Sequence, residues 1–112
     1  MKSKTSLSVL SKKYLEGKGY VVEKVEHFNF FAKIRMDLLG VGDLLALDGK
    51  ELLLVQVTSR AHLAERAEKA KNCEKLKLWL SAGGKFILHG WDKVKNRWRL
   101  EERLLEGVKN DG

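Results

Sequence analysis

The sequence has 112 residues, of which 44% are hydrophobic and 33% charged, so it favours one globular domain with a modest core over disorder. A single cysteine excludes an internal disulfide and a cysteine-cluster zinc site, and no apolar run approaches the roughly 20 residues of a membrane span. The net charge of +7 fits either a polyanionic partner, most commonly nucleic acid, or a merely soluble basic surface.

The chain begins with a predicted helix and strand. Ser3 or Thr5 is expected to cap the helix, and Gly17 and Gly19 end it. Its apolar stripe has three members, spaced three and four residues apart: Leu7, Leu10 and Tyr14. Residues 20–25 then alternate as a first strand. The start lacks the long apolar core of a secretory signal, and with the lone cysteine this predicts a cytoplasmic protein.

Two short apolar runs, 44–47 and 52–57, form the centre of the sequence. Between them stands an Asp-Gly turn signal, which favours a β-hairpin over a helix. The aromatic stretch 27–31 leads into this hairpin without a predicted structure of its own.

The polar residues at the open end of the hairpin are brought together by its pairing. If Leu47 faces Leu52, Asp43 lies directly opposite Gln56, and a tighter turn would shift the register by two residues and leave the pair diagonal. In both registers Asp43, Gln56 and Thr58 share one side of the sheet, because strand side chains alternate. A carboxylate, an amide oxygen and a hydroxyl on one face are a plausible seat for a hard divalent cation.

Each of these residues also has a structural interpretation. Asp43 fits an acid that accepts backbone hydrogen bonds at a strand entrance, and Gln56 fits an amide satisfied within the sheet. Asp37 fits a loop acid that caps a turn. It enters the same site as Asp43 if the stretch from Gly40 to Gly42 bends back, which glycine permits.

The second half of the chain is predicted to be a helix and two strands. Residues 61–80 contain no Gly or Pro and favour one long helix capped by Ser59. Six residues form its buried stripe: Leu63, Ala67, Ala70, Cys73, Leu76 and Leu80. Strands are expected over 85–91 and 97–103, joined by a turn. The three histidines lie in different elements and are expected to be packed or on the surface, and Cys73 is expected in the core.

The predicted fold class is α/β, of order αβββαβ with an extra C-terminal strand, as a mixed central sheet flanked by helices. It forms one domain over 1–106, and 107–112 are a frayed tail. This order and the hairpin resemble the restriction-endonuclease-like core of the PD-(D/E)XK nuclease superfamily, especially the archaeal Holliday-junction resolvases. The stretches DLLGVGDLLAL, LVQVTSR and LHGW are also similar to small phage-encoded nuclease-like proteins.

The resemblance assigns roles to individual residues. Asp43 matches the first acid of the motif, Gln56 stands at the second acid and Thr58 at the lysine. It implies Mg²⁺ (or Mn²⁺) held by Asp43, Gln56 and the carbonyl of Val57, and Asp37 is the residue expected to add a second carboxylate. Thr58 carries no positive charge, so a neighbouring basic residue is expected to supply it: Arg60, Lys33 or Arg35. The first-helix acid of the superfamily is not evident in this chain.

Three hypotheses follow. The first is a metal-dependent nuclease acting on DNA, with contacts to nucleic acid from Lys12, Lys13, Lys33, Arg35 and Arg60. The second is a nuclease-fold protein that binds nucleic acid without catalysis, as the missing lysine and first-helix acid suggest. The third is a small phage protein-interaction module. The resemblance further implies a homodimer, and a bacterial or phage-infected host cell as its setting.

Overall fold

The computed structural model describes residues 6–25, 27–29 and 31–105, with the backbone alone for 27–29 and 34–36. The elements, in chain order, are α1 (Leu7–Gly17), β1 (Val21–Lys24), β2 (His27–Asn29), β3 (Ile34–Met36), β4 (Leu44–Leu47), β5 (Leu52–Ser59), η1 (Arg60–His62), α2 (Leu63–Lys71), α3 (Glu74–Ser81), β6 (Lys85–Val94) and β7 (Arg97–Leu105).

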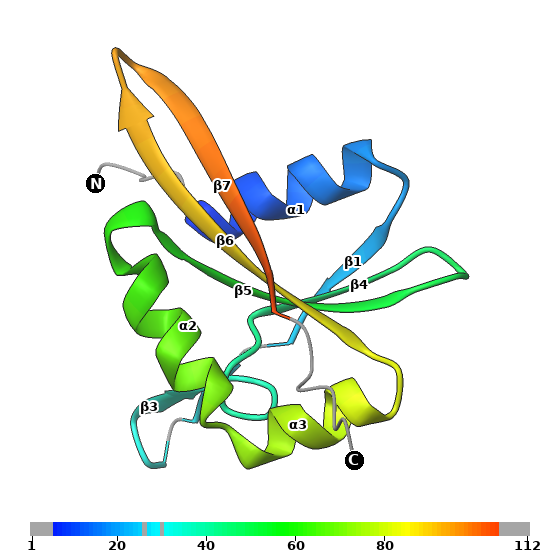
Figure 1. Ribbon diagram of the computed structural model, residues 1–112. Coiled ribbons are helices and arrows are strands. Elements are labelled where there is room, and N and C mark those ends of the chain that lie inside the picture. The colour runs from blue at the N-terminus through cyan, green and yellow to red at the C-terminus, as the bar shows by residue number, and fades with distance from the viewer. Residues whose placement is uncertain (1–5, 26, 30, 106–112) are drawn as a thin grey trace.

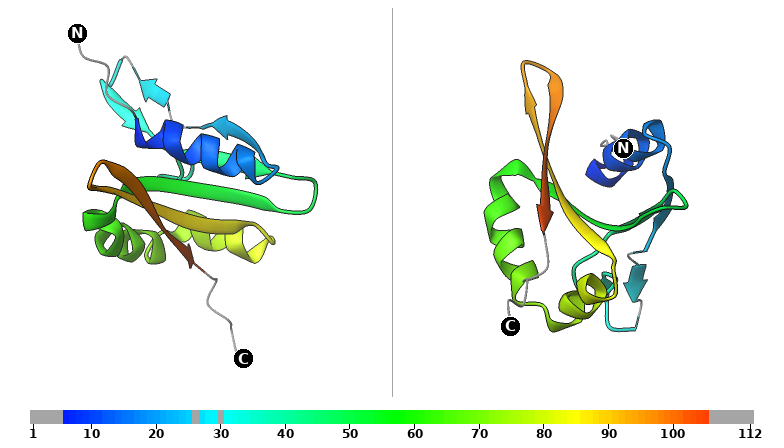
Figure 2. Two further views of the ribbon diagram at one scale, coloured as in Figure 1. Left: turned by 90° about the horizontal axis from the view of Figure 1, so that it is seen from above. Right: turned by 45° about the vertical axis from the view of Figure 1, so that its right-hand side comes forward.

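A five-stranded mixed sheet organises the molecule. Its strand order is β1-β4-β5-β6-β7, and all neighbours are antiparallel except β5 and β6, which are parallel. Helix α1 covers one face of the sheet, and α2 and α3 cover the other (Figures 1 and 2). This is the predicted αβββαβ order with an extra C-terminal strand, and the fold class is confirmed.

The sheet separates two hydrophobic clusters. The cluster under α1 contains Leu15, Val22, Leu44, Ala46, Leu53 and Val55. The cluster under α2 and α3 contains Val41, Leu54, Leu63, Ala70, Leu76, Phe86 and Leu88. Successive residues of β5 therefore alternate between the two clusters, as strand geometry requires. Gln56 and Thr58 continue the row of Leu54 and lie on the α2 side.

The first helix differs in detail from its prediction. Its N-cap is Ser6, whose hydroxyl accepts a hydrogen bond from the backbone N–H of Ser8 (3.2 Å), whereas Ser3 and Thr5 lie outside the described residues. The buried residues of α1 are Ser11 and Leu15 rather than the predicted apolar stripe. A serine occupies the centre of the buried face because polar groups of the sheet bind it there.

The predicted long helix 61–80 is divided into η1, α2 and α3. The break falls at Asn72 and Cys73, where the Cys73 backbone is extended and its thiol donates to the carbonyl of Leu39 (3.4 Å). Asn72 is the C-cap of α2, and its side-chain amide donates to the carbonyl of Glu68 (3.1 Å), so the helix ends on a local polar cap although no Gly or Pro marks the break. Cys73 is consequently half-buried at a helix start, and Ser59 makes no capping hydrogen bond but pairs with His62.

The central hairpin has the register in which Leu47 faces Leu52. Between β1 and β4 the chain makes an excursion that was not predicted, a separate two-stranded sheet of β2 and β3. After this excursion, β4 pairs with β1 as well as with β5.

Strands β6 and β7 are longer than predicted and form a hairpin that projects beyond the rest of the molecule (Figure 2). Its turn is formed by Lys95 and Asn96, both with positive φ (51° and 64°), which suits a tight two-residue hairpin turn. Within the described part of the chain, no helix is both long and apolar enough to cross a membrane.

Candidate metal site and its surroundings

Asp43 lies where β4 and β5 part. Its Oδ2 accepts a hydrogen bond from the backbone N–H of Val57 (2.7 Å), and its own backbone N–H donates to the carbonyl of Val55 (2.8 Å). Its carbonyl accepts from the N–H of Val25 (3.0 Å). Asp43 thus connects three adjacent strands and is only 8% exposed. The structural interpretation, an acid at a strand entrance that accepts a backbone hydrogen bond, holds for Asp43.

Gln56 and Thr58 follow each other on the α2 side of β5. They are 3% and 8% exposed, respectively. The Oε1 of Gln56 is buried and has no hydrogen-bond partner among the described residues, so the amide is not satisfied within the sheet. The ladder of β4 and β5 ends at the pair of Leu44 and Val55, and the Asp43 N–H donates to the Val55 carbonyl, so Asp43 departs from the register that would place it directly opposite Gln56.

The turn that carries Asp37 does bend back toward Asp43. Leu38 and Gly42 exchange two backbone hydrogen bonds of 2.9 Å, so the chain turns back on itself and Asp37 and Asp43 flank this isolated antiparallel bridge. One oxygen of Asp37, Oδ1, is buried and has no hydrogen-bond partner among the described residues. The bend thereby brings two carboxylates to the same end of the hairpin.

Gly42 is needed for this bend. It lies directly over Leu54, so that a Cβ at this position would come within 2.2 Å of Leu54 Cδ1. The turn therefore crosses the α2 face of β5 at Leu54, one strand row before Gln56. Because glycine has no Cβ atom, the turn can lie this close to the sheet.

The donor set at this place consists of oxygen atoms. Val57 adds to it, because the N–H and C=O of one strand residue point to the same side, and the Val57 N–H points to Asp43. Two carboxylates, an amide oxygen and a backbone carbonyl suit a hard divalent cation. No group of three or more His, Cys, Asp or Glu that could hold a metal ion occurs in the described part of the chain, so the site depends on Gln56 and Val57.

The structure describes the side chains of two of the three predicted substitutes for the missing lysine, Arg60 and Lys33. Arg60 is directed to the β6–β7 hairpin, where its Nε is 3.0 Å from Glu101 Oε1 and its Nη1 is 3.4 Å from Asp92 Oδ2. Arg99, with Arg60, holds the pKa of Asp92 below its ordinary value, so this ion pair stays charged. Lys33 is exposed in the turn between β2 and β3, and the side chain of Arg35 lies outside the described residues.

Glu16, near the end of α1, does not supply the first-helix acid of the superfamily. Glu16 forms an exposed ion pair with Lys12 (3.0 Å), and α1 packs on the face of the sheet opposite to Gln56. The other predicted contact on this helix, Lys13, is also exposed.

A second polar cluster, which the sequence analysis missed, lies under α1. The indole N–H of Trp91 donates to Ser11 Oγ (2.8 Å), and Ser11 Oγ lies 2.8 Å from His89 Nδ1, which accepts from the hydroxyl when the neutral ring carries its proton on Nε2. The N–H at Nε2 of His89 then donates to Glu102 (3.0 Å), which also accepts from Tyr14 (3.2 Å).

This chain of hydrogen bonds is a structural element. Ser11 and His89 are 0% exposed, so no substrate reaches the hydroxyl, and a serine-hydrolase role is excluded. Burial lowers the pKa of His89, against an opposing effect of Glu102, which keeps the ring neutral as the hydrogen-bond pattern requires. The signal in the sequence was His89, a polar residue inside the apolar run 86–91.

No family model and no curated protein matches the sequence. Among solved structures, the chain is similar to the Holliday junction resolvase Hjc of Archaeoglobus fulgidus, with a TM-score of 0.50 and 16% identity. The match covers 84% of this chain and 67% of the resolvase. At this identity the likeness concerns the fold alone. Together with the topology of the sheet, it shows that this chain has a restriction-endonuclease-like α/β fold.

Proposed function

We propose that this chain is a metal-dependent nuclease of the PD-(D/E)XK type that hydrolyses phosphodiester bonds in DNA. The observation that carries the proposal is the buried, unpartnered Oε1 of Gln56. Leaving a buried polar atom without a partner costs about 1–3 kcal/mol, and a cation bound by this oxygen would remove that cost. The resolvase-like fold supports the same function.

The residues that would hold the cation are Asp37, Asp43 and Gln56, with the carbonyl of Val57. When bound, Mg²⁺ or Mn²⁺ polarises the phosphate and makes water a better nucleophile at neutral pH. The protein fixes Asp43 through its 2.7 Å hydrogen bond from Val57 N–H, which keeps one carboxylate oxygen at the strand end. Thr58 can orient water through its hydroxyl, but it adds no charge.

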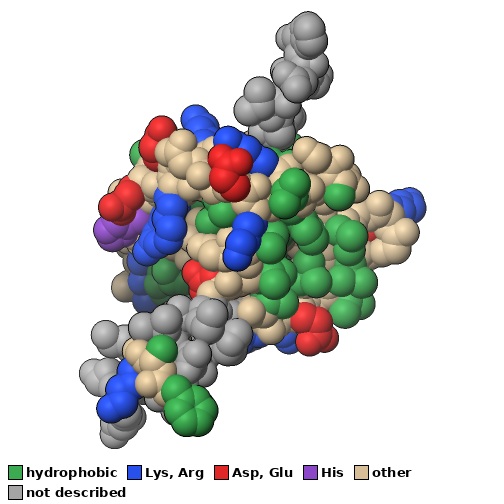
Figure 3. Space-filling model, turned by 90° about the horizontal axis from the view of Figure 1, so that it is seen from below, with side chains coloured by type: hydrophobic (Ala, Val, Ile, Leu, Met, Phe, Trp, Pro, Cys, Tyr) green, Lys and Arg blue, Asp and Glu red, His purple; other side chains and the backbone are tan. Residues whose placement is uncertain are grey.

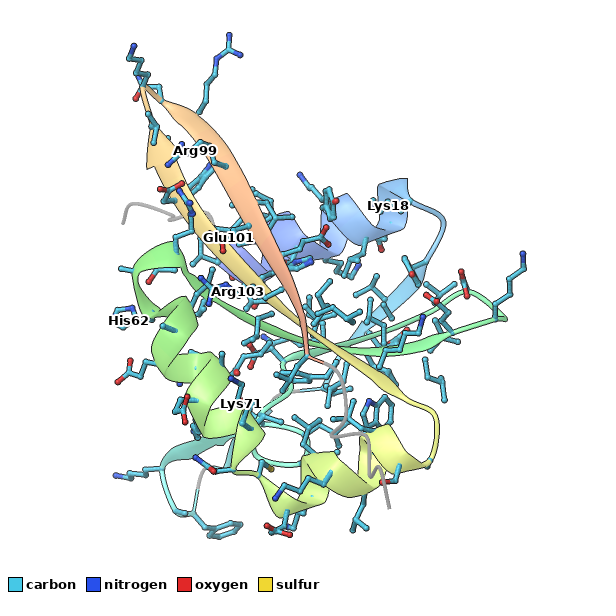
Figure 4. All side chains as sticks on the ribbon, viewed as in Figure 1. Lys18, His62, Lys71, Arg99, Glu101 and Arg103 are labelled. Carbon is cyan, nitrogen blue, oxygen red and sulfur yellow. The ribbon has the colours of Figure 1, made fainter. Side chains whose placement is uncertain are left out.

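The β6–β7 hairpin offers a surface for duplex DNA. Lys93, Lys95 and Arg97 are exposed around its tip, which projects from the molecule (Figure 2). A two-stranded ribbon fits the major groove, and lysine and arginine bind phosphates on either side of it. Arg99, Glu101 and Arg103 follow along β7 (Figure 4), where the acids Asp92 and Glu101 hold the arginines in ion pairs.

Five further contacts to DNA remain proposals from the sequence: Lys12, Lys13, Lys33, Arg35 and Arg60. A homodimer also remains a proposal. Hydrophobic side chains gather on the side of the molecule that carries α3 (Figure 3), where Leu78 is 72% exposed. An apolar surface of this kind suits the contact between two copies.

A second candidate function is DNA binding without catalysis. It is favoured by Thr58 at the position of the motif lysine, and by the engagement of Arg60 with Glu101 and Asp92. If no basic side chain reaches the phosphate in this site, the protein would bind DNA and leave it intact.

The test is cleavage of labelled single-stranded, duplex and four-way-junction DNA with Mg²⁺, Mn²⁺ or EDTA. Wild type is compared with Asp43→Asn and Gln56→Ala, and binding of Mn²⁺ alone is measured by calorimetry. Cleavage that needs metal and is lost in Asp43→Asn, together with weaker Mn²⁺ binding, is the expected result.

Glu65→Gln is the matched control, since it removes one negative charge from an exposed position of α2. It should leave cleavage and Mn²⁺ binding unchanged. Salt-sensitive binding without cleavage under any metal would select the second candidate, and the absence of both binding and cleavage would overturn both.

A further inference from the structure

Arg66, on α2, carries a buried donor that the fold does not use. The Nε of its guanidinium is buried and has no hydrogen-bond partner among the described residues. A guanidinium stays protonated in proteins and donates only, so burying its N–H without an acceptor is unfavourable. An acceptor from outside the chain would satisfy it.

The height of Arg66 along the sheet follows from its neighbours. Leu63 packs on Gly90, where a Cβ would meet Leu63 at 2.5 Å, and Gly90 pairs with Thr58. Because β5 and β6 are parallel, α2 runs back along β5. Arg66 is about 4.5 Å further along the helix axis than Leu63, and Gln56 is about 6.6 Å back along β5 from Thr58. Arg66 and Gln56 are therefore at similar heights.

The flank of α2 that carries Arg66 is turned toward β4. Leu63 and Ala70 face the sheet, and Arg66 and Lys71 lie on opposite flanks, about 140° apart at 3.6 residues per turn. In the right-handed sense of such crossovers, the Arg66 flank faces β4 and the Lys71 flank faces β6 and β7. Figure 4 agrees, since Lys71 lies on the side of α2 toward the end of β7.

Two buried, unpartnered groups of opposite kind thus border the same place. Gln56 offers an acceptor oxygen and Arg66 a charged donor, and they do not bond to each other. A cation alone satisfies Gln56, and an anion alone satisfies Arg66. A phosphate diester bound together with a divalent cation satisfies both.

We infer that Arg66 binds the scissile phosphate and supplies the positive charge that Thr58 cannot. This inference rests on the proposed function and assigns a residue to it that the motif does not contain. Arg66 donates N–H bonds to a non-bridging phosphate oxygen and stabilises the charge that grows there as water attacks. It stays protonated throughout, so it forms no covalent bond and moves no proton.

The experiment compares Arg66→Gln, Arg66→Lys and Arg66→Gln/Thr58→Lys with wild type. Lys69→Gln is the matched control, because it removes one positive charge from an exposed position three residues along the same helix. Three properties are measured: the melting temperature without DNA, the affinity for duplex DNA with Ca²⁺ or with EDTA, and cleavage with Mg²⁺. Ca²⁺ prefers oxygen ligands as Mg²⁺ does.

Arg66→Gln should melt no lower than wild type, because the lost donor had no partner. Its affinity in Ca²⁺ should fall about tenfold or more, as for a lost charge-assisted hydrogen bond, and Lys69→Gln should lose far less. Arg66→Lys should retain part of the affinity, and Thr58→Lys should restore part of the affinity and of the cleavage lost in Arg66→Gln.

Two results would overturn the inference. One is a lower melting temperature of Arg66→Gln with no greater loss of affinity than in Lys69→Gln, which would make Arg66 a structural residue. The other is full cleavage by Arg66→Gln, which leaves the proposed function intact. If wild type does not cleave but Arg66→Gln still loses affinity specifically in Ca²⁺, nuclease activity fails and the phosphate contact stands.

Discussion

His89 is a buried base whose two ring nitrogens have different partners. Nδ1 faces the Ser11 hydroxyl and Nε2 faces the Glu102 carboxylate, and in the neutral ring, which burial favours by lowering the pKa of His89, Nε2 donates to Glu102 and Nδ1 accepts from Ser11. Protonation would place a second donor toward the Ser11 hydroxyl and force it to turn away. Ser11 lies 78 residues from His89 in the chain, so the sequence predicted a packed histidine but not the partners that determine its charge.

The stability of the protein should therefore depend on pH through His89. Burial lowers its pKa from the ordinary value of 6.5, so between the two values the unfolded state binds more protons than the folded state. The contribution of His89 to the free energy of unfolding should be largest above pH 6.5. Below pH 6.5 the free energy of unfolding should fall by at most about 1.4 kcal/mol per pH unit. Urea unfolding between pH 5.5 and 8 measures this.

The relevant comparison is the pH dependence, whatever the absolute stability of each variant. His89→Gln should have a flatter profile than wild type, whereas His62→Gln, at an exposed position, should keep the wild-type slope. Equal slopes in His89→Gln and wild type would contradict the assignment.

At the level of elements, local sequence was sufficient where the pattern is short-range. The central hairpin was predicted from alternation and from turn residues, and the structure contains it with the first of the two registers that the sequence left open. The bend at Gly40 to Gly42, which glycine permits, is also present. The break at Cys73 and the hairpin of β2 and β3 were not predicted, because the cap of α2 by Asn72 and the turn between β2 and β3 both lack the glycine that marks the turn of the central hairpin. Gln56 was predicted at the site, but its lack of a partner becomes visible only in three dimensions.

The close packing of the turn on β5 makes Gly42 a sensitive position. In Gly42→Ala, the new Cβ would clash with Leu54, which is 0% exposed and has no room to move. We expect a loss of about 1–3 kcal/mol in the free energy of unfolding, as for overpacked cores, and weaker Mn²⁺ binding because Asp37 is displaced. Chemical denaturation and calorimetry measure the two effects.

Gly17→Ala is the control for this substitution. A Cβ at Gly17 would meet nothing within 4 Å, and its φ is ordinary for L-residues. The control should be as stable as wild type or more so. Unchanged stability and Mn²⁺ binding in Gly42→Ala would show that the turn does not depend on this contact.

At the scale of the whole molecule, the position of the basic side chains matters more than the net charge of +7. The total charge fitted a polyanionic partner or a soluble basic surface, but it could not place Lys93, Lys95 and Arg97 around the tip of one projecting hairpin. Two acids of that hairpin, Asp92 and Glu101, are paired with arginines, and the third, Glu102, is bonded to His89. Its tip therefore presents mainly positive charge.

Changing Lys93, Lys95 and Arg97 together to glutamine should weaken binding to duplex DNA and reduce its dependence on salt. Each lost phosphate contact lowers the slope of log K against log salt by about 0.9. Titrations at several salt concentrations give this slope. The triple variant Lys69, Lys71 and Lys75 to glutamine removes the same charge from the helices α2 and α3, and should leave the slope near that of wild type. Equal slopes in the two triple variants would show that the β6–β7 hairpin is not part of the DNA-binding surface.

The outer edge of β7 also affects how copies of this protein meet. An edge strand of nine residues could pair with the same strand of another molecule and start an open-ended aggregate. Arginines at 97, 99 and 103 and glutamates at 101 and 102 line this strand, and most are exposed. Stacking such strands would force charged side chains together and strip them of water. The charged edge thus opposes such pairing of strands, and the proposed homodimer would use the apolar side at α3 instead.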